Sequence, residues 1–425
     1  MASQAASLRR ILAFAGTHSP FYRERFAGRP LDTAPLASLP PLDKQTLMER
    51  WDEVVTVPDL RLAEVEAHLD GLERDDYLGG RYRAMATGGT TGRRGVFVFD
   101  RQEWSACLAG FLRWSDWSGT RPRLPRLRVA SVSATSPVHM TARFGMSIDV
   151  GLHRLLRLDA RAPVDELCAA IERFRPDALI GYPSVLALLA LEQLEGRLHV
   201  APRTVSTTSE VRTPEMTERI RTAWGAEPFD VYGITEAGIF AVDCEHHAGK
   251  HLFEDLAFVE VVDEAGRAVP DGEPGAHLLV TNLFNRTLPL IRYEVDDLVT
   301  LSPEPCPCGR PLRVIAALEG RSDDILRLPG ATGGTVAVHP HALRSPLARF
   351  GDVAQCRVVH DEDGVHVELV LRANASPDTP ERVAEALGDA LRALGADPPV
   401  TARAVKRLER AAGPAGKLKL VESRL

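Results

Sequence analysis

Residues 87–95 have the sequence TGGTTGRRG, which contains four glycines and three threonines. Glycine leaves room for backbone N–H groups to converge on an anion, and threonine hydroxyls add further donors. The segment therefore predicts a loop that holds phosphate oxygens, and a flexible hairpin turn is the alternative because glycine-rich turns are common. It is not a Walker loop, since no Gly-Lys-Ser/Thr leads into a helix. The candidate phosphate contacts are Thr87, Gly88, Gly89, Thr90, Thr91 and Gly92.

Four later segments carry polar groups that could handle a charged ligand. Residues 232–236 read YGITE at the end of an expected strand, and residues 292–298, RYEVDDL, hold paired carboxylates. Residues 320–324 read GRSDD, and residues 413–420, near the end of the chain, read GPAGKLKL. Taken alone, each segment is equally a turn between strands or a solvated charge. Only their combination suggests one site.

Cysteine and histidine gather at two places in the second half of the chain. The residues are Cys244, His246, His247 and His251 at the first place and Cys306 and Cys308 at the second. Three thiolates and one imidazole would suit a closed tetrahedral zinc site that staples two loops. The alternative is that the cysteines are reduced and packed while the histidines face solvent. The six cysteines of the whole chain are too scattered for the disulfide framework of a small secreted protein.

The segments between residues 100 and 235 alternate between strand and helix. We expect strands at 128–133, 177–181, 204–209 and 228–232, and helices at 102–117, 163–174, 183–195 and 213–223. Short connections in such an alternation predict a parallel sheet covered by helices, with ligands at the carboxyl ends of its strands. Ser209 and Glu210 lie at the end of one strand, so we expect them beside a ligand. His139 follows another, and a purely structural role is the alternative for it.

The pattern changes to β from about residue 256. Runs at 258–262, 276–282 and 288–293 predict a small antiparallel sheet or barrel. Beyond the GRSDD segment, strands at 355–360 and 365–371 and a helix at 380–394 predict a smaller α+β unit. One or two further helices are expected within residues 7–26, around a break at Ser19-Pro20. The fold class is therefore α/β, with a β-rich region and a small carboxy-terminal unit.

Composition limits the classes of function. The chain has 425 residues, enough for two or three cores, and its 44% hydrophobic and 26% charged residues are those of an ordinary globular protein. A net charge of −7 without a block of basic residues argues against nucleic acid as a partner. No apolar run approaches the roughly 20 residues that cross a bilayer, and no signal peptide pattern opens the sequence. We expect a cytoplasmic protein with no membrane partner.

The succession of motifs resembles that of the acyl-adenylate-forming enzymes, and the phenylacetate–CoA ligase-like group fits best. The TGGTTG segment resembles the family's phosphate loop, with Arg94-Gly95 where the family often has Pro-Lys. YGITE resembles the family's Tyr-Gly-x-Thr-Glu motif, and RYEVDDL resembles Arg-Tyr-x-Thr-Gly-Asp-Leu with Asp296 in place of the glycine. Residues 21–23 and 39–44 resemble the amino-terminal signature of the group. The glycine-threonine loop and the four later segments follow one another in the order of the family's motifs. Five motifs in the right order are much harder to obtain by chance than one.

The resemblance implies where the nucleotide binds. Tyr232 would pack against adenine, Gly233 would also contact the nucleotide, Thr235 would bond the α-phosphate, and Glu236 would hold Mg²⁺. Asp297 would accept the ribose hydroxyls. Ser209 and Glu210 would lie alongside the nucleotide, and Arg321 would contact its ribose and phosphate region.

The resemblance also implies a moving lid and a metal. Asp323 would be the hinge of a lid at residues 323–425, after an adenylation domain at residues 1–322. Lys417 would enter the site during adenylation, with Lys419 in reserve. Relatives carry a similar Cys…Gly-x-His…Cys-x-Cys-Gly pattern, which implies that the structural zinc ligands are Cys244, His251, Cys306 and Cys308.

The function implied is that of an acid–thiol ligase. ATP and Mg²⁺ would activate a carboxylic acid, of the aryl or arylacetic class, as an acyl-adenylate, and CoA would then take the acyl group as a thioester. One alternative is a stand-alone adenylating enzyme that passes the acyl group to an acyl carrier protein or an amine. Another is a non-catalytic nucleotide-binding or interaction protein. The resemblance also allows a homodimer.

Overall fold

A nine-stranded mixed sheet forms the centre of the fold, with strand order β13-β14-β9-β8-β7-β6-β5-β3-β4. The computed structural model describes residues 2–27, 29, 35–87, 94–321, 324–338, 340–344, 346–372, 375–409 and 417–425. The five strands from β7 to β4 in this order are parallel, and the other neighbours are antiparallel. The strands are β3 (Arg128–Ser133), β4 (Arg154–Asp159), β5 (Ala178–Gly181), β6 (Thr204–Thr208), β7 (Phe229–Ile234), β8 (Gly238–Asp243), β9 (Lys250–Leu252), β13 (Asp297–Leu301) and β14 (Val314–Arg321).

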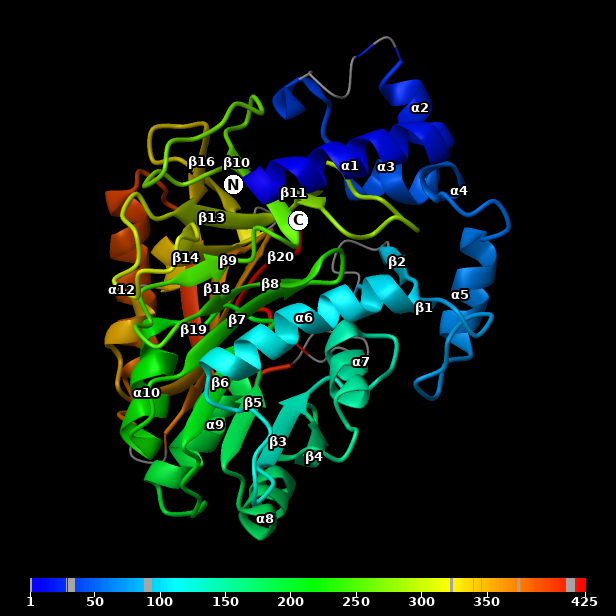
Figure 1. Cartoon of the computed structure of the whole chain (residues 1–425). Helices are drawn as coiled ribbons and strands as arrows, with labels where there is room; N and C mark the ends of the chain where they lie inside the picture. The colour runs from blue at the N-terminus through cyan, green and yellow to red at the C-terminus, as the bar shows by residue number, and fades with distance from the viewer. Residues whose placement is uncertain are drawn as a thin grey trace.

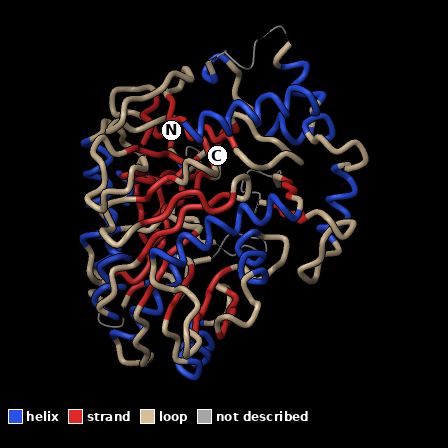
Figure 2. Tube along the Cα trace, viewed as in Figure 1, coloured by secondary structure: helices blue, strands red, loops and turns tan. Residues whose placement is uncertain are grey.

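Three helices connect the parallel strands and cover one face of the sheet, as the alternation predicts (Figures 1 and 2). They are α8 (Val164–Phe174), α9 (Pro183–Leu194) and α10 (Pro214–Trp224). A proline opens α9 and α10, where its missing N–H costs no helical hydrogen bond. The Thr213 hydroxyl caps α10 by accepting a 3.3 Å hydrogen bond from the Met216 amide. Apolar residues of these helices pack against β3, β5 and β6 in one core.

The other face of the sheet is covered by α6 (Arg101–Trp117), which crosses it in Figure 1, and by α7 (Met140–Ser147). Asp100 and Glu103 form a capping box at the start of α6. A Cβ on Gly110 would come within 2.2 Å of the Ile239 carbonyl oxygen, so only glycine lets α6 pack so closely on β8.

Amino-terminal elements share a core with α6. They are α1 (Ala2–His18), α2 (Pro20–Arg25), a 3₁₀ turn (Leu36–Ser38), α3 (Lys44–Glu49), α4 (Trp51–Val54), α5 (Leu62–Asp70) and the antiparallel pair β1 (Arg83–Ala86) and β2 (Val96–Phe99). The helix break expected at Ser19-Pro20 is present. This core holds the hairpin that carries the glycine-threonine segment.

The expected small antiparallel sheet consists of β10 (Ala257–Val262), β11 (His277–Asn282) and β12 (Tyr293–Val295). The strand predicted at 288–293 is wrong for residues 288–292, because the chain turns just before Tyr293. Arg292 has a left-handed φ of 49°, and its amide donates to the Thr281 hydroxyl at 2.9 Å instead of to a strand. Its buried guanidinium pairs with Glu260 at 3.1 Å.

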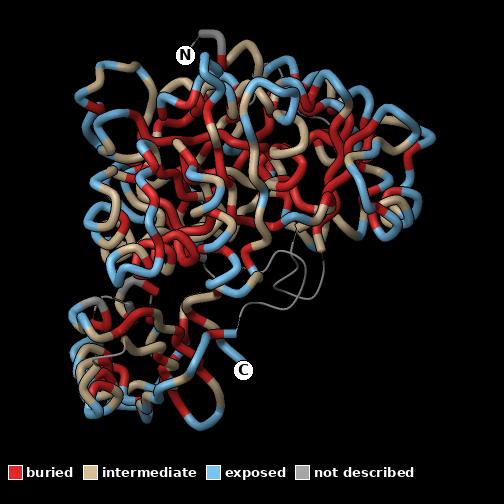
Figure 3. Tube along the Cα trace, turned by 90° about the horizontal axis from the view of Figure 1, so that it is seen from below, coloured by how far each residue is buried: buried red, intermediate tan, exposed pale blue. Residues whose placement is uncertain are grey.

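The carboxy-terminal residues pack around a core of their own, which includes residues from Leu326 to Val421. Figure 3 shows buried residues gathered inside two lobes, with the C-terminus beside the smaller one. The elements are β15 (Leu326–Pro329), β16 (Thr335–Val338), α11 (Pro340–Arg344), a 3₁₀ turn (Leu347–Arg349), β17 (Val353–Asp361), β18 (Gly364–Leu371), α12 (Thr379–Ala393), β19 (Val400–Ala404) and β20 (Val421–Ser423). The domain boundary at 322/323 and the hinge role of Asp323, which lies outside the described residues, stay predictions. Within the described part of the chain, every helix is too short or too polar to span a membrane.

Candidate functional site

A cavity of about 980 Å³ opens where the carboxyl ends of the parallel strands meet the tail of the chain. Its lining comes from the central sheet, from α6 and α7, and from residues 417–421. Nine of the residues predicted to form the site line it: Thr87, Ser209, Glu210, Tyr232, Gly233, Thr235, Glu236, Asp297 and Lys417. Motifs that are far apart in the sequence therefore meet around one space. That space is large enough for a nucleotide and a small organic acid together.

The aromatic and acidic residues of two motifs are joined directly. The Tyr232 hydroxyl donates a 2.6 Å hydrogen bond to Oδ2 of Asp297. The Tyr232 ring packs against Phe240, with 4.9 Å between ring centroids. Asp297 stands opposite Arg321 in the β13–β14 register, so the GRSDD segment begins beside the predicted ribose site. The Arg321 side chain itself is outside the described part of the structure.

Glu236 is held on both its side chain and its backbone. Its carboxylate is hydrogen-bonded to Tyr293, a buried residue of the RYEVDDL segment. Burial, together with the negative charge of Glu236, raises the pKa of the Tyr293 hydroxyl far above its usual value, which keeps it a neutral donor. Asn282 donates a 3.1 Å bond to the Glu236 carbonyl oxygen. A carboxylate oriented in this way at the cavity wall suits Mg²⁺, which prefers oxygen ligands.

The base of the glycine-threonine loop is closed by two hydrogen bonds. The Thr87 amide donates to the Gly95 carbonyl at 2.9 Å, and the Gly95 amide donates to the Thr87 hydroxyl at 2.8 Å. The other predicted phosphate contacts, Gly88, Gly89, Thr90, Thr91 and Gly92, lie outside the described residues. Arg94, which follows the gap in the described part of the loop, pairs with Asp70 of α5 at 2.7 Å.

Glu210 lines the cavity, but its carboxylate is bonded to protein. Oε1 accepts a 2.8 Å hydrogen bond from the Leu418 amide, and Oε2 accepts one of 3.2 Å from the Ser184 amide. The preceding residue, Ser209, has a left-handed φ of 69°, a conformation that non-glycine residues adopt at some cost and that often marks functional sites. The role beside the nucleotide predicted for these two residues stays a prediction.

Lys417 lies at the cavity, next to His139. Burial and, second, the positive charge of Lys417 lower the pKa of His139 to about 4, so the imidazole is neutral at neutral pH. Lys419, the reserve candidate, is paired with Asp324 at 3.3 Å. Both lysines line the cavity but in different surroundings, since the charge of Lys417 acts on His139 and Lys419 is paired with Asp324.

One branch of the cavity is apolar. It lies between α6, α7 and the strands β3, β4, β5 and β8, and its walls are Phe111, Trp114, Met140, Phe144, Ile148, Val129, Leu155, Ile180 and Ile239. The Phe144 ring stacks on Phe111 and on Trp104, with centroids 6.2 and 5.0 Å away. This branch therefore has apolar, partly aromatic walls, which suit an apolar group.

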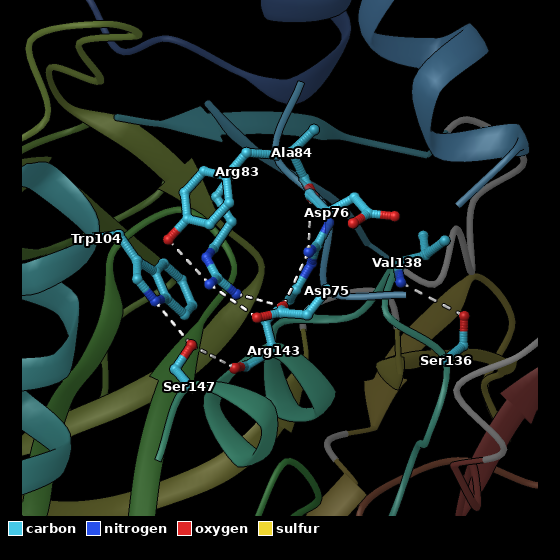
Figure 4. Close-up of polar contacts among 10 residues, drawn as sticks. Asp75, Asp76, Arg83, Ala84, Trp104, Ser136, Val138, Arg143 and Ser147 are labelled. Carbon is cyan, nitrogen blue, oxygen red and sulfur yellow. Dashed lines mark hydrogen bonds and ion pairs between the residues drawn. The ribbon is translucent and has the colours of Figure 1, made fainter. Parts of the chain in front are cut away.

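A buried ion network fixes α7, the helix that carries Phe144, against the loop hairpin. The fully buried Arg143 binds the Asp75 carboxylate and the Asp76 carbonyl, each at 3.0 Å (Figure 4). Asp75 also pairs with Arg83 of β1. Because β1 leads to Thr87 at the base of the glycine-threonine loop, the network links this base to the helix that carries Phe144. No local pattern predicts this network, since lone arginines are usually solvated.

The structure brings the predicted zinc ligands together. The ligand atoms of Cys244, His251, Cys306 and Cys308 lie within 4.8 Å of one another. The Cys244 and Cys306 sulfurs are 3.6 Å apart, and Cys308 Sγ is 3.4 Å from His251 Nε2. Three thiols and an imidazole are the donor set of a closed zinc site. His246 and His247 are not part of this cluster.

The surroundings of the cluster fit a metal. Backbone amides of His246 and Arg310 donate to the sulfurs of Cys244 and Cys308 at 3.4 and 3.5 Å, which is how thiolates are stabilised. Burial raises the pKa of Cys244 to about 12, so a cation is needed to hold this thiol deprotonated. Zinc itself remains a prediction.

Comparisons with known proteins agree with this geometry. Residues 84–281 match the model of the AMP-binding enzyme family. The chain is 25% identical to the phenylacetate-coenzyme A ligase of Thermus thermophilus over 93% of this chain and 83% of the relative. It is 26% identical to that of Pseudomonas putida over 73% of this chain and 76% of the relative.

A solved structure shares the fold. The 2-hydroxyisobutyryl-CoA ligase, in the postadenylation state with R3-HIB-AMP, superposes with a TM-score of 0.77 at 20% identity, covering 99% of this chain and 89% of that chain. The same ligase, with 2-HIB-AMP and CoA in the thioesterification state, gives 0.62 at 21% identity and the same coverage. Residues 84–281 thus resemble the AMP-binding enzymes, and the chain over most of its length is similar to the phenylacetate-coenzyme A ligases.

Proposed function

We propose that this protein is an ATP-dependent acid–thiol ligase that converts a carboxylic acid of the aryl or arylacetic class into its CoA thioester. The observation that carries the proposal is the single cavity in which Thr87, Glu236, Asp297 and Lys417 meet an apolar branch. Nucleotide-binding groups and a pocket for an apolar acyl group are thus side by side. The sequence relatives named phenylacetate-coenzyme A ligase support the same reaction.

The first half-reaction joins the acid to AMP. A carboxylate oxygen attacks the α-phosphorus of ATP, the bond to the bridging oxygen breaks, and pyrophosphate leaves with the electron pair. Asp297 would hold the ribose, Thr235 would bond the α-phosphate, and Lys417 would stabilise the negative charge that grows between the carboxylate and the phosphate. Glu236, oriented by Tyr293, would hold the Mg²⁺ that spreads the phosphate charge.

The second half-reaction releases AMP. The thiol sulfur of CoA gives up its proton to solvent and attacks the carbonyl carbon of the acyl-adenylate. The bond between that carbon and the phosphate oxygen breaks, and AMP leaves with the electron pair. We propose that residues 323–425 move as a lid between the halves, so that one site serves both steps.

The apolar branch supports an aromatic acid. Its walls carry Phe111, Trp114 and Phe144, and Phe144 lies flat against Phe111. A benzoic or phenylacetic ring can stack on these faces, whereas a short aliphatic acid would leave most of the branch empty. We place the acyl group there, with its carboxylate toward Lys417.

The test is acid-dependent pyrophosphate release with ATP and Mg²⁺ across benzoic, hydroxybenzoic, aminobenzoic, phenylacetic and short aliphatic acids. We expect release with one aromatic class, and AMP and thioester formation when CoA is added. AMP formation with an acyl carrier protein or an amine but not with CoA would replace the ligase with the carrier-loading alternative. No release with any acid, from protein that binds ATP, would refute the proposed function. Light scattering, which gives the molar mass in solution, decides whether the protein forms the homodimer that the resemblance allows.

A further inference from the structure

Glu210 joins two parts of the chain that would separate if the lid moved. Its Oε2 accepts from the amide of Ser184, in the first turn of α9, which is part of the large body. Its Oε1 accepts from the amide of Leu418, 208 positions later in the carboxy-terminal tail. A carboxylate that accepts two amide hydrogen bonds is a strong, charge-assisted connection.

The backbone before Glu210 sets this carboxylate in place. Strand β6 ends at Thr208, and Ser209 then adopts the left-handed conformation, with φ of 69°. This turn takes the chain out of the line of the strand before Glu210. The negative charge then lies at the amino end of α9, where the helix dipole favours it. The Ser184 bond lies wholly within the body, so Glu210 would keep its orientation when the tail leaves.

Other contacts show that this edge of the body receives the carboxy-terminal unit. Arg219 of α10 donates to the carbonyls of Ala354 and Val353, at 2.6 and 3.2 Å. Gln355 donates a 3.5 Å bond to the carbonyl of Ser184, the same residue whose amide holds Glu210. These contacts dock β17, while the Glu210 contact docks the tail.

The tail contact bears on Lys417 because Lys417 and Leu418 are neighbours in the chain. Fixing the Leu418 amide at Glu210 fixes the point from which the Lys417 side chain leaves the backbone. The Leu418 side chain is 6% exposed, so the residue is also packed. Lys417 then lies at the cavity beside His139, whose pKa its charge lowers.

We propose that Glu210 is a latch that holds the tail in the position in which Lys417 serves adenylation. This inference rests on the proposed function, and it makes Glu210 a positioning residue that acts through Lys417. It replaces the contact with the nucleotide that the sequence suggested for Glu210. The latch belongs to the first half-reaction only, because thioester formation uses the other position of the lid.

The test separates the two half-reactions in the variant Glu210→Gln, whose carboxamide can accept only one of the two amide bonds. Adenylation is measured as pyrophosphate–ATP exchange with the acid that the panel identifies. Thioester formation is measured from the synthetic acyl-adenylate of that acid and CoA. We expect the kcat of exchange to fall about 10- to 100-fold, and thioester formation to change less than about twofold. Retained thioester formation also shows that the variant is folded.

The control is Glu166→Gln, which removes an exposed carboxylate in the first turn of α8, and we expect it to leave both rates unchanged. A second pair of variants removes the partner instead. Leu418→Pro lacks the amide donor and should slow exchange as Glu210→Gln does, while Leu418→Ala keeps the amide and should slow it less. Combining Glu210→Gln with Leu418→Pro should add little further loss, because both remove the same bond.

Two results would overturn the latch. Equal losses in both half-reactions would show a general structural role for Glu210. A raised KM for ATP with an unchanged kcat would show that Glu210 binds the nucleotide instead. The proposed function fails in a different way, since wild-type protein would then show no exchange with any acid.

Discussion

The Tyr232 hydroxyl donates a 2.6 Å hydrogen bond to the Asp297 carboxylate, although the two residues are 65 positions apart in the sequence. Tyr232 belongs to β7 and Asp297 opens β13, so the bond joins the parallel and antiparallel parts of the central sheet. It also orients the carboxylate that is predicted to accept the ribose hydroxyls. One predicted nucleotide contact is thus held by another.

Removing either partner of this bond should weaken ATP binding, but to different degrees. Asp297→Ala removes a charged acceptor, and we expect it to raise the KM for ATP about 10- to 100-fold. Tyr232→Phe keeps the ring and loses only the orienting bond, so a rise of about 3- to 10-fold is expected. Initial rates of pyrophosphate release at varied ATP measure both. A larger effect from Tyr232→Phe than from Asp297→Ala would contradict the ribose role.

The lysines of the tail should differ in their effect on adenylation. We expect Lys417→Ala to slow pyrophosphate–ATP exchange about 10²- to 10³-fold, because a charge aimed at the developing transition state is lost. Thioester formation from the synthetic acyl-adenylate should be retained. Lys419→Ala is the matched control, since Lys419 is paired with Asp324 and should change exchange much less. If Lys419→Ala has the larger effect, the roles of the two lysines are reversed.

Much of the fold followed from local patterns in the sequence. The helix expected at 183–195 is α9 (Pro183–Leu194), and the strand expected at 128–133 is β3, because apolar spacing and a leading proline act over a few residues. The strand prediction at 288–293 was wrong for residues 288–292 because the backbone of Arg292 is left-handed. In this conformation Arg292 contacts Thr281 and Glu260. Such tertiary contacts override a local preference for strand.

The site was predictable where motifs carry it and hidden where it depends on distant partners. The spacing of Cys306 and Cys308 pointed to the Cys/His cluster. Nothing local indicates that Tyr293 bonds Glu236, or that Glu210 accepts from Leu418, because those partners meet only when the sheets and the tail are assembled. The left-handed backbone conformation of Ser209 could likewise not be predicted, because its neighbours in the sequence are ordinary polar residues.

Stability should fall in mild acid because of His139. Burial, aided by the charge of Lys417, lowers the pKa of His139 to about 4 in the folded protein, against about 6.5 when unfolded. Between these values the unfolded chain binds more protons, so stability is lost as pH falls from about 6.5 to about 4. The contribution of His139 to the loss at pH 5 is about 2 kcal/mol.

Urea denaturation at pH 7.5 and pH 5 measures this dependence. His139→Gln cannot take up the proton, so the difference in unfolding free energy between the two pH values should shrink by about 2 kcal/mol. An unchanged difference would mean that other groups cause the acid sensitivity. Lys417→Ala should shrink it in part, because His139 would then be easier to protonate.

The Cys/His cluster should hold one structural zinc ion. Protein purified without chelator is expected to contain about one zinc per chain by mass spectrometry of the metal, as three thiolates and an imidazole require. Cys306→Ser should lose the metal and a link between residues 62 positions apart. A cross-link of that kind contributes roughly 2–4 kcal/mol, so the thermal midpoint should fall by about 5 °C or more. Cys356→Ala, outside the cluster, should keep the zinc. The cluster is a reduced, packed group of thiols if wild-type protein carries no metal and Cys306→Ser leaves the midpoint unchanged.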